Sequence, residues 1–139
     1  MRHTTREKTM DLFTPLTLGD LRLDNRIVMA PMTRRRADAD GTPTKLQAEY
    51  YAQRAGLGLI ITEGVYPSRE ARGYPGQPGI ITSEQAAGWA RVADAVHDAG
   101  ATIAMQIMHG GRVTHPDITG TERIVAPRAC LTNIAGTRR

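Results

Sequence analysis

The sequence has little cysteine and few aromatic residues. It contains one Cys, one Trp, one Phe and four Tyr among 139 residues. The single cysteine, Cys130, excludes an internal disulfide framework and any zinc or iron–sulfur cluster held by cysteines of this segment alone. This cysteine usage fits a reducing compartment, and we expect a cytoplasmic protein.

The sequence also lacks long hydrophobic runs. No apolar stretch approaches the roughly 20 residues that span a bilayer, and the polar, basic residues 1–9 do not form a signal peptide. We therefore expect no membrane partner. The formal charge is +4, but the basic residues are scattered and no aromatic residues are interleaved with them. This pattern argues against nucleic-acid binding.

A chain of this length is suited to one domain with its own core. The pattern divides it into three parts: a basic extension at residues 1–10, a folded part at 11–127, and a tail at 128–139 with little periodicity. We interpret the tail as a truncation or frameshift product.

Three apolar runs in the folded part have the character of buried strands. They lie at residues 26–31, 57–61 and 101–108, and they show no polar alternation. Such runs are typical of strands covered on both faces in a parallel sheet. Because parallel neighbours need helical crossovers, the order strand, helix, strand, helix, strand predicts two βαβ units that share a strand.

Two helices are expected between these runs. The first covers residues 45–56, with Thr44 as its N-cap and Gly56 as a left-handed stop. The second begins after Thr82, which forms a capping-box pattern with the glutamine three positions later, and it closes at Gly100.

Polar or backbone-exposing residues follow or end each apolar run. In α/β folds, ligands bind at the carboxyl ends of parallel strands. Pro31 has no amide hydrogen and ends the pairing of the first strand, and Thr33 then presents a hydroxyl. We expect Thr33, Gly64 and Gln106 to be grouped at one end of the sheet.

Several polar residues have more than one interpretation. The Gln106 carboxamide either binds the imide edge of a ligand or is satisfied by neighbouring backbone, because leaving it unpaired in a strand would cost about 1–3 kcal/mol. Glu63 is a general base or an anchor of the strand end. His109 and His115 with Asp117 could suggest a metal, but ordering of the loop is favoured, and we expect no metal site.

Three segments carry a family resemblance. "NRIVMAPMTRRRA", "ITEGVYPSREARGYPGQPGI" and "MQIMHGGR" resemble consecutive signature segments of the Old Yellow Enzyme family, the FMN-dependent NAD(P)H:ene reductases. The likeness runs from about Leu12 to Pro127. It implies the α/β fold class, with residues 11–127 as the N-terminal βαβαβ part of an FMN-binding TIM (β/α)8 barrel that is incomplete in this chain.

The resemblance also implies roles for residues at the strand ends. Pro31 and Met32 would contact the flavin through the main chain, and Thr33 would hydrogen-bond near its O4 and N5. Gly64 would let the backbone approach the ring, and Gln106 would bind the pyrimidine edge. Tyr74 would line the substrate space.

A complete (β/α)8 barrel needs about 250 residues. The family's substrate-binding histidine pair, its tyrosine proton donor and its phosphate-binding loops have no match here, so the catalytic residues stay unknown. We expect an FMN-dependent oxidoreductase in fragment form, in which hydride from NADH or NADPH passes through the flavin to an α,β-unsaturated small molecule. This chain alone is expected to be inactive. The alternative is a non-enzymatic remnant that needs a partner chain to supply the missing strands, and the open barrel edge also allows self-association.

Overall fold

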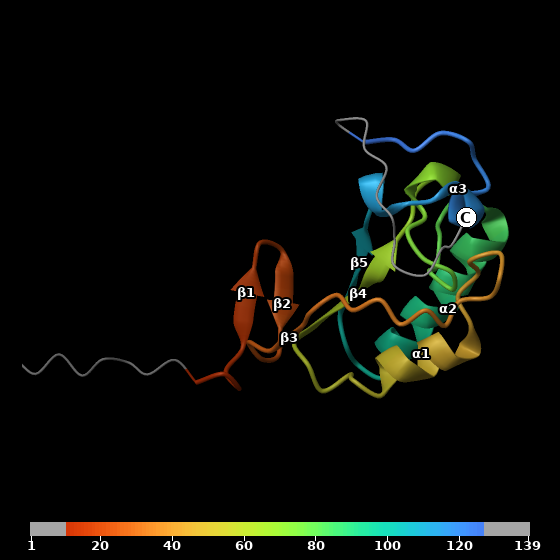
Figure 1. Ribbon diagram of the computed structural model, residues 1–139. Helices are drawn as coiled ribbons and strands as arrows, with labels where there is room; N and C mark the ends of the chain where they lie inside the picture. The colour runs from red at the N-terminus through yellow and green to blue at the C-terminus, as the bar shows by residue number, and fades with distance from the viewer. Residues whose placement is uncertain (1–10, 127–139) are drawn as a thin grey trace, which may run out of the picture.

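The computed structural model of the chain describes residues 11–126, which form two small sheets and two main helices (Figure 1). The extension at 1–10 and the tail at 128–139 lie outside the described residues. Within residues 11–126, no helix is both long enough and apolar enough to cross a bilayer.

The chain begins with a β-hairpin that the sequence did not lead us to expect. Strand β1 (Leu16–Leu18) pairs antiparallel with β2 (Leu21–Leu23), and Gly19 takes a positive φ of 58° at the turn. Figure 1 shows the hairpin standing apart from the two main helices. Each strand has only three residues, which is too short for a clear alternating pattern.

A parallel sheet follows, with strand order β3-β4-β5. Its strands are β3 (Val28–Met29), β4 (Leu59–Val65) and β5 (Ile103–Ile107). Met29 lies opposite Ile60, and Ile60 lies opposite Ile103. The predicted chain order and parallel direction are confirmed.

The predicted bounds of all three strands differ from the observed ones, and β5 is shorter than the expected run at 101–108. Strand β3 has two residues rather than six because the Ile27 N–H bonds to the Asn25 side chain at 3.0 Å and Pro31 has no N–H to give. Strand β4 continues four residues past Ile61 to Val65, across an irregularity in register between Ile61 and Gly64. The polar Thr62, Glu63 and Gly64 therefore lie within the strand.

The helices are α1 (Lys45–Ala52) and α2 (Ser83–Asp98). Both predicted N-caps, Thr44 and Thr82, are confirmed. Gly100 has a positive φ of 83° and ends α2 as predicted. Gly56 does not adopt a left-handed conformation; α1 instead ends at Ala52 and the chain leaves through further turns.

Both helices pack against one face of the parallel sheet, where the core lies. Its buried residues include Tyr51, Ile60 and Val65, together with Trp89, Val92 and Val96 of α2. Val65 packs in this core, so its strand neighbour Gly64 lies on the face away from the helices, and Gln106 lies on the face opposite Ile103, which packs against the core three positions earlier. Apolar side chains stay exposed on the outer strands, with Val28 45%, Met105 37% and Ile107 55% exposed.

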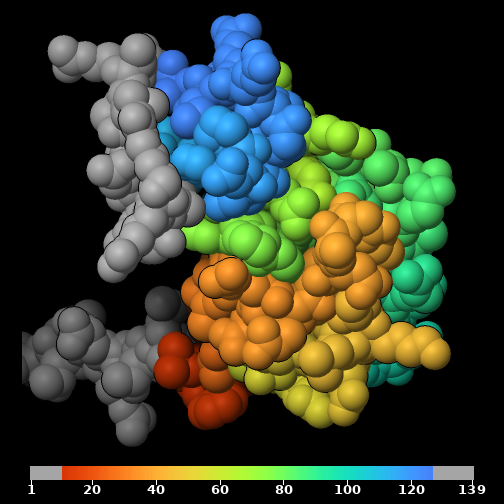
Figure 2. Space-filling view, turned by 45° about the vertical axis from the view of Figure 1, so that its right-hand side comes forward, coloured from red at the N-terminus to blue at the C-terminus, as the bar shows by residue number. Residues whose placement is uncertain are grey.

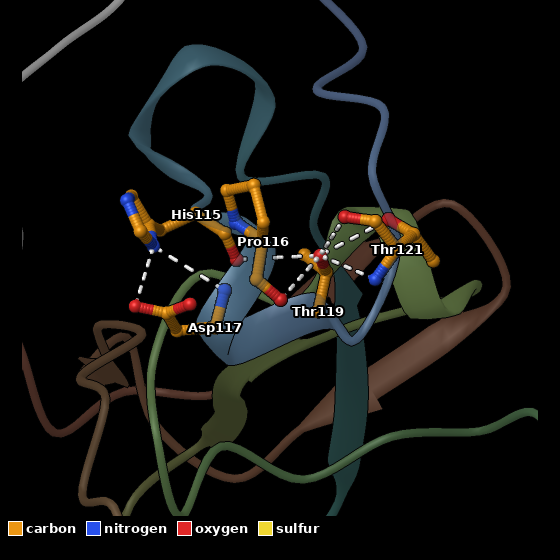
Figure 3. A network of polar contacts seen from close by, with 5 residues as sticks. All are labelled: His115, Pro116, Asp117, Thr119 and Thr121. Carbon is orange, nitrogen blue, oxygen red and sulfur yellow. Dashed lines mark hydrogen bonds and ion pairs between the residues drawn. The ribbon is translucent and has the colours of Figure 1, made fainter.

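Short helical turns complete the end of the sheet where β4 and β5 finish. They are η1 (Arg69–Ala71), η2 (Gly111–Val113) and α3 (Pro116–Thr119). The buried Thr119 hydroxyl holds the end of α3: its Oγ1 lies 3.3 Å from the His115 carbonyl oxygen and accepts a hydrogen bond from Thr121 N–H at 3.2 Å (Figure 3). This network orders the segment after β5.

Candidate functional site

The carboxyl ends of the three parallel strands meet as predicted. Gly64 of β4 is the direct neighbour of Gln106 of β5 in the ladder. The segment after β3 joins them because the Arg34 N–H donates a hydrogen bond to Glu63 Oε2 at 2.9 Å. Thr33, Gly64 and Gln106 are thus grouped at one end of the sheet.

Gln106 is held by its backbone and has a free side chain. Its N–H donates to the Thr62 hydroxyl at 3.1 Å. The half-buried carboxamide makes no hydrogen bond with any residue between 11 and 126. The interpretation that neighbouring backbone satisfies this amide is therefore wrong for the part of the chain that the structure describes. A donor and an acceptor remain free side by side.

The segment Pro31–Thr33 presents its groups at the same end. Pro31 is half-buried, Met32 is 43% exposed, and Thr33 is exposed. The Thr33 hydroxyl forms no hydrogen bond with the other described residues. This segment therefore offers a hydroxyl and main-chain groups at the same end of the sheet as Gln106.

Gly64 is a position where a side chain does not fit. A Cβ built there would lie 2.7 Å from both Sδ and Cε of Met108. The space that a side chain would need is filled by Met108, whose Cβ also lies 3.0 Å from the built position. The free Gln106 carboxamide, next to Gly64 in the ladder, offers one donor and one acceptor to a ligand with an imide edge.

The loop that carries Tyr74 is fixed against these strand ends. Buried Gln77 donates from Nε2 to the Gly64 carbonyl oxygen at 2.9 Å and accepts at Oε1 from Gly73 N–H at 2.8 Å. On its other side, Arg35 Nε donates to the Pro75 carbonyl at 3.1 Å. In Figure 2 the orange segment after β3 lies against this yellow-green loop. Tyr74 itself is 36% exposed.

Glu63 is an anchor and not an accessible base. Its side chain is fully buried and accepts hydrogen bonds at Oε1 from Gln47 Nε2 at 2.8 Å and from the Tyr51 hydroxyl at 3.3 Å. Burial is the main cause that raises the pKa of Tyr51 above its ordinary value of 10.0; the hydrogen bond from the Glu63 N–H opposes this rise, and the Glu63 carboxyl group adds to it. The anchor interpretation of Glu63 is thus confirmed.

Sequence reasoning missed Gln47 and Tyr51 as partners of Glu63. They are spaced i, i+4 on α1, so they share one face of the helix. Both are fully or almost fully buried, with exposed fractions of 1% and 0%. A glutamine at this spacing on the buried face was the signal available in the sequence.

The histidines form no metal centre in the described part of the chain. Among residues 11–126, no three His, Cys, Asp or Glu side chains converge as ligands. His109 Nδ1 accepts a hydrogen bond from Gly111 N–H at 2.9 Å and so orders the loop after β5. His115 pairs locally with Asp117 at 3.3 Å (Figure 3).

Comparison with known proteins identifies the family of this chain. The profile of the NADH:flavin oxidoreductase / NADH oxidase family matches residues 11–138. The chain belongs to this family. The chain is 47% identical to the flavin oxidoreductase hxnT of Emericella nidulans over 121 residues, which cover 84% of this chain and 31% of the relative. A probable flavin mononucleotide-dependent alkene reductase of Leishmania infantum is 43% identical over 124 residues, covering 88% of this chain and 34% of the relative.

Solved structures of the family show the same fold. The old yellow enzyme homologue of Zymomonas mobilis superimposes with a TM-score of 0.84 at 45% identity, covering 87% of this chain and 34% of that one. The expected fold class is confirmed: the parallel strands and helices are the N-terminal βαβαβ part of a TIM (β/α)8 barrel, which residues 11–126 do not close. The chain spans about a third of the length of the family members it matches.

Proposed function

We propose that this chain forms the flavin-contacting strand ends of an FMN-dependent oxidoreductase of the ene-reductase type. The observation that carries the proposal is the free Gln106 carboxamide beside Gly64, at the same end of the sheet as Thr33. Membership of the NADH:flavin oxidoreductase / NADH oxidase family supports it. The name of the Leishmania relative supports the alkene as acceptor.

The residues of the site have separate tasks in this proposal. When bound, FMN supplies hydride transfer from NADH or NADPH to an activated alkene. The Gln106 carboxamide binds the pyrimidine edge with one donor and one acceptor, and the Thr33 hydroxyl binds beside it. Pro31 and Met32 contribute main-chain groups. Gly64 gives close access to the backbone once Met108 rotates.

Tyr74 lines the substrate space above these groups in the same proposal. Its loop cannot drift far from the flavin site because Gln77 ties it to the Gly64 carbonyl. Such fixed positioning is what holds a substrate in a reactive geometry. Tyr74 therefore contributes shape and contact at the substrate side, while the groups that act on protons remain unassigned.

A second candidate function is favoured by the exposed apolar side chains of β5. Met105 and Ile107 are 37% and 55% exposed, and β5 pairs on one edge only within residues 11–126. An open apolar strand is a template for pairing with a further strand. In this alternative, residues 11–126 bind FMN weakly and turn over only when another chain or a second copy covers β5.

The test is titration of FMN with the purified chain, followed by flavin fluorescence, and then an assay with NADPH and cyclohexenone. We expect saturable FMN binding and turnover no faster than a free-flavin blank. A chain that leaves FMN fluorescence unchanged overturns the proposed function. Turnover well above the blank shows that the site is complete, and gel filtration then tells whether a self-assembled oligomer completes it.

A further inference from the structure

We propose that Glu63 is a positioning residue that fixes the segment Pro31–Arg34 for the flavin, and that only a carboxylate at this position does so. The inference rests on the proposed FMN site. Glu63 itself points away from that site, toward α1, and acts through the main chain of Arg34. A residue at position 63 therefore sets where Met32 and Thr33 lie.

Three donors surround the carboxylate. Oε1 accepts hydrogen bonds from Gln47 Nε2 at 2.8 Å and from the Tyr51 hydroxyl at 3.3 Å. Oε2 accepts one from the Arg34 N–H at 2.9 Å. The side chain is fully buried, so water does not compete for these bonds. A carboxylate accepts at both oxygens, so this one side chain joins β4 to α1 and to Arg34 at the same time.

Two of the three donors, Gln47 Nε2 and the Arg34 N–H, cannot accept a hydrogen bond. Gln47 Oε1 already accepts from the Thr44 N–H at 2.9 Å, which turns its Nε2 toward Glu63. The Tyr51 oxygen already accepts from the Glu63 N–H at 2.8 Å, which directs its proton toward Oε1. The Arg34 donor is a backbone group. A neutral glutamine at position 63 would therefore point its NH2 either at Gln47 Nε2 or at the Arg34 N–H.

A second hydrogen bond attaches the chain just after Arg34. The Thr44 hydroxyl donates to the Arg36 carbonyl at 3.0 Å, so the chain is fixed two residues further on. Between β3 and this tie, the Arg34–Glu63 bond is the hydrogen bond that joins Pro31–Arg34 to β4 in the described residues. Removing it takes away the direct bond from this segment to β4, while the Arg35–Pro75 bond and the Arg34 guanidinium over the Tyr50 ring remain.

The experiment compares Glu63→Gln with Tyr51→Phe and with the reciprocal pair Glu63→Gln/Gln47→Glu in the full chain. Tyr51→Phe removes a donor to Oε1 and the acceptor of the Glu63 N–H, and it leaves the Arg34 bond in place. In the reciprocal pair, the carboxylate introduced at position 47 accepts from the amide NH2 introduced at position 63, so that the amide oxygen at position 63 faces Arg34 again. Two quantities are measured: hydrogen exchange of the Arg34 amide relative to that of Val96 in the core, and FMN affinity by fluorescence.

We expect Glu63→Gln to speed hydrogen exchange of the Arg34 amide by about tenfold and to weaken FMN binding by about tenfold. The reciprocal pair should restore most of the protection at Arg34 and most of the FMN affinity. Tyr51→Phe should change FMN affinity by less than about threefold. Loss of protection at Arg34 with unchanged FMN affinity overturns the inference, as does a failure of the pair to restore Arg34. If the unaltered chain does not bind FMN, the proposed function fails, whereas the exchange data still show whether Glu63 holds Arg34.

Discussion

Gln77 joins Gly73 to Gly64 through one buried carboxamide. Its Nε2 donates to the Gly64 carbonyl at 2.9 Å, and its Oε1 accepts from the Gly73 N–H at 2.8 Å. The loop that carries Tyr74 is therefore tied to the strand end that we assign to the flavin, and both ties come from a side chain with 0% exposure.

Replacing Gln77 with alanine should destabilise the chain. The change leaves the Gly64 carbonyl and the Gly73 N–H without their partners in a buried place, and we expect a loss of about 1–3 kcal/mol in the free energy of unfolding. Urea denaturation followed by circular dichroism measures it. Gln53→Ala is the matched control because Gln53 is exposed, and it should cost less than about 0.5 kcal/mol. Equal effects of the two changes would contradict the account.

Two glycines should respond in opposite ways to a larger side chain. Gly64→Val places a branched side chain 2.7 Å from Met108 atoms, and we expect a loss of about 1–3 kcal/mol together with loss of FMN retention on gel filtration. Gly56→Ala meets nothing within 4 Å and does not need a positive φ, so it should be neutral or stabilising by up to about 1 kcal/mol. A Gly64→Val protein that kept its flavin would show that Gly64 is misplaced.

Gln106→Ala separates binding from stability. The side chain forms no hydrogen bond within residues 11–126, so its loss should leave the unfolding midpoint nearly unchanged. Its loss should weaken FMN binding by about 1–3 kcal/mol, because the ligand's polar edge then lacks a partner in a partly dry site. Fluorescence titration gives the affinity, with Gln53→Ala again as the control. The same affinity for both variants would remove Gln106 from the site.

Asp40 should make stability depend on pH at the acid end. The Thr42 N–H, which donates to Asp40 Oδ1 at 2.9 Å, lowers the pKa of this carboxyl below its ordinary 3.8, with a smaller contribution from Arg72. A lowered folded-state pKa stabilises the fold above pH 3.8, and this contribution is lost as the pH falls through the folded-state value. Unfolding curves between about pH 6 and pH 2 should fall less steeply for Asp40→Asn. A variant with the same slope as the unaltered chain would contradict this.

The sequence predicts the parallel sheet well and the short elements poorly. The order of β3, β4 and β5 follows from apolar runs separated by helical crossovers, which leave few topologies. The hairpin β1–β2 has strands of three residues, and α1 ends at Ala52 rather than at Gly56. Local pattern does not determine either feature.

The site was predictable where a polar residue interrupts an apolar run. Gln106 and Gly64 stand out in this way, and the structure places them side by side. The hydrogen bonds that hold the site in place were not predictable from the sequence. Gln77 bonds to a backbone carbonyl thirteen residues away, and Gln47 bonds to a carboxylate sixteen residues away. Such pairs depend on how the elements pack, and residue type alone does not reveal them.

Amide NMR spectra of the chain during FMN titration test the central claim most directly, because they show where the ligand binds. The account predicts concentration-dependent shifts for the amides of Thr33, Gly64 and Gln106 at the carboxyl ends of the strands. Amides at the opposite ends, such as Gly58 and Thr102, should stay in place. Shifts confined to those opposite ends, or no shift at Gly64 and Gln106 at saturating FMN, would contradict it.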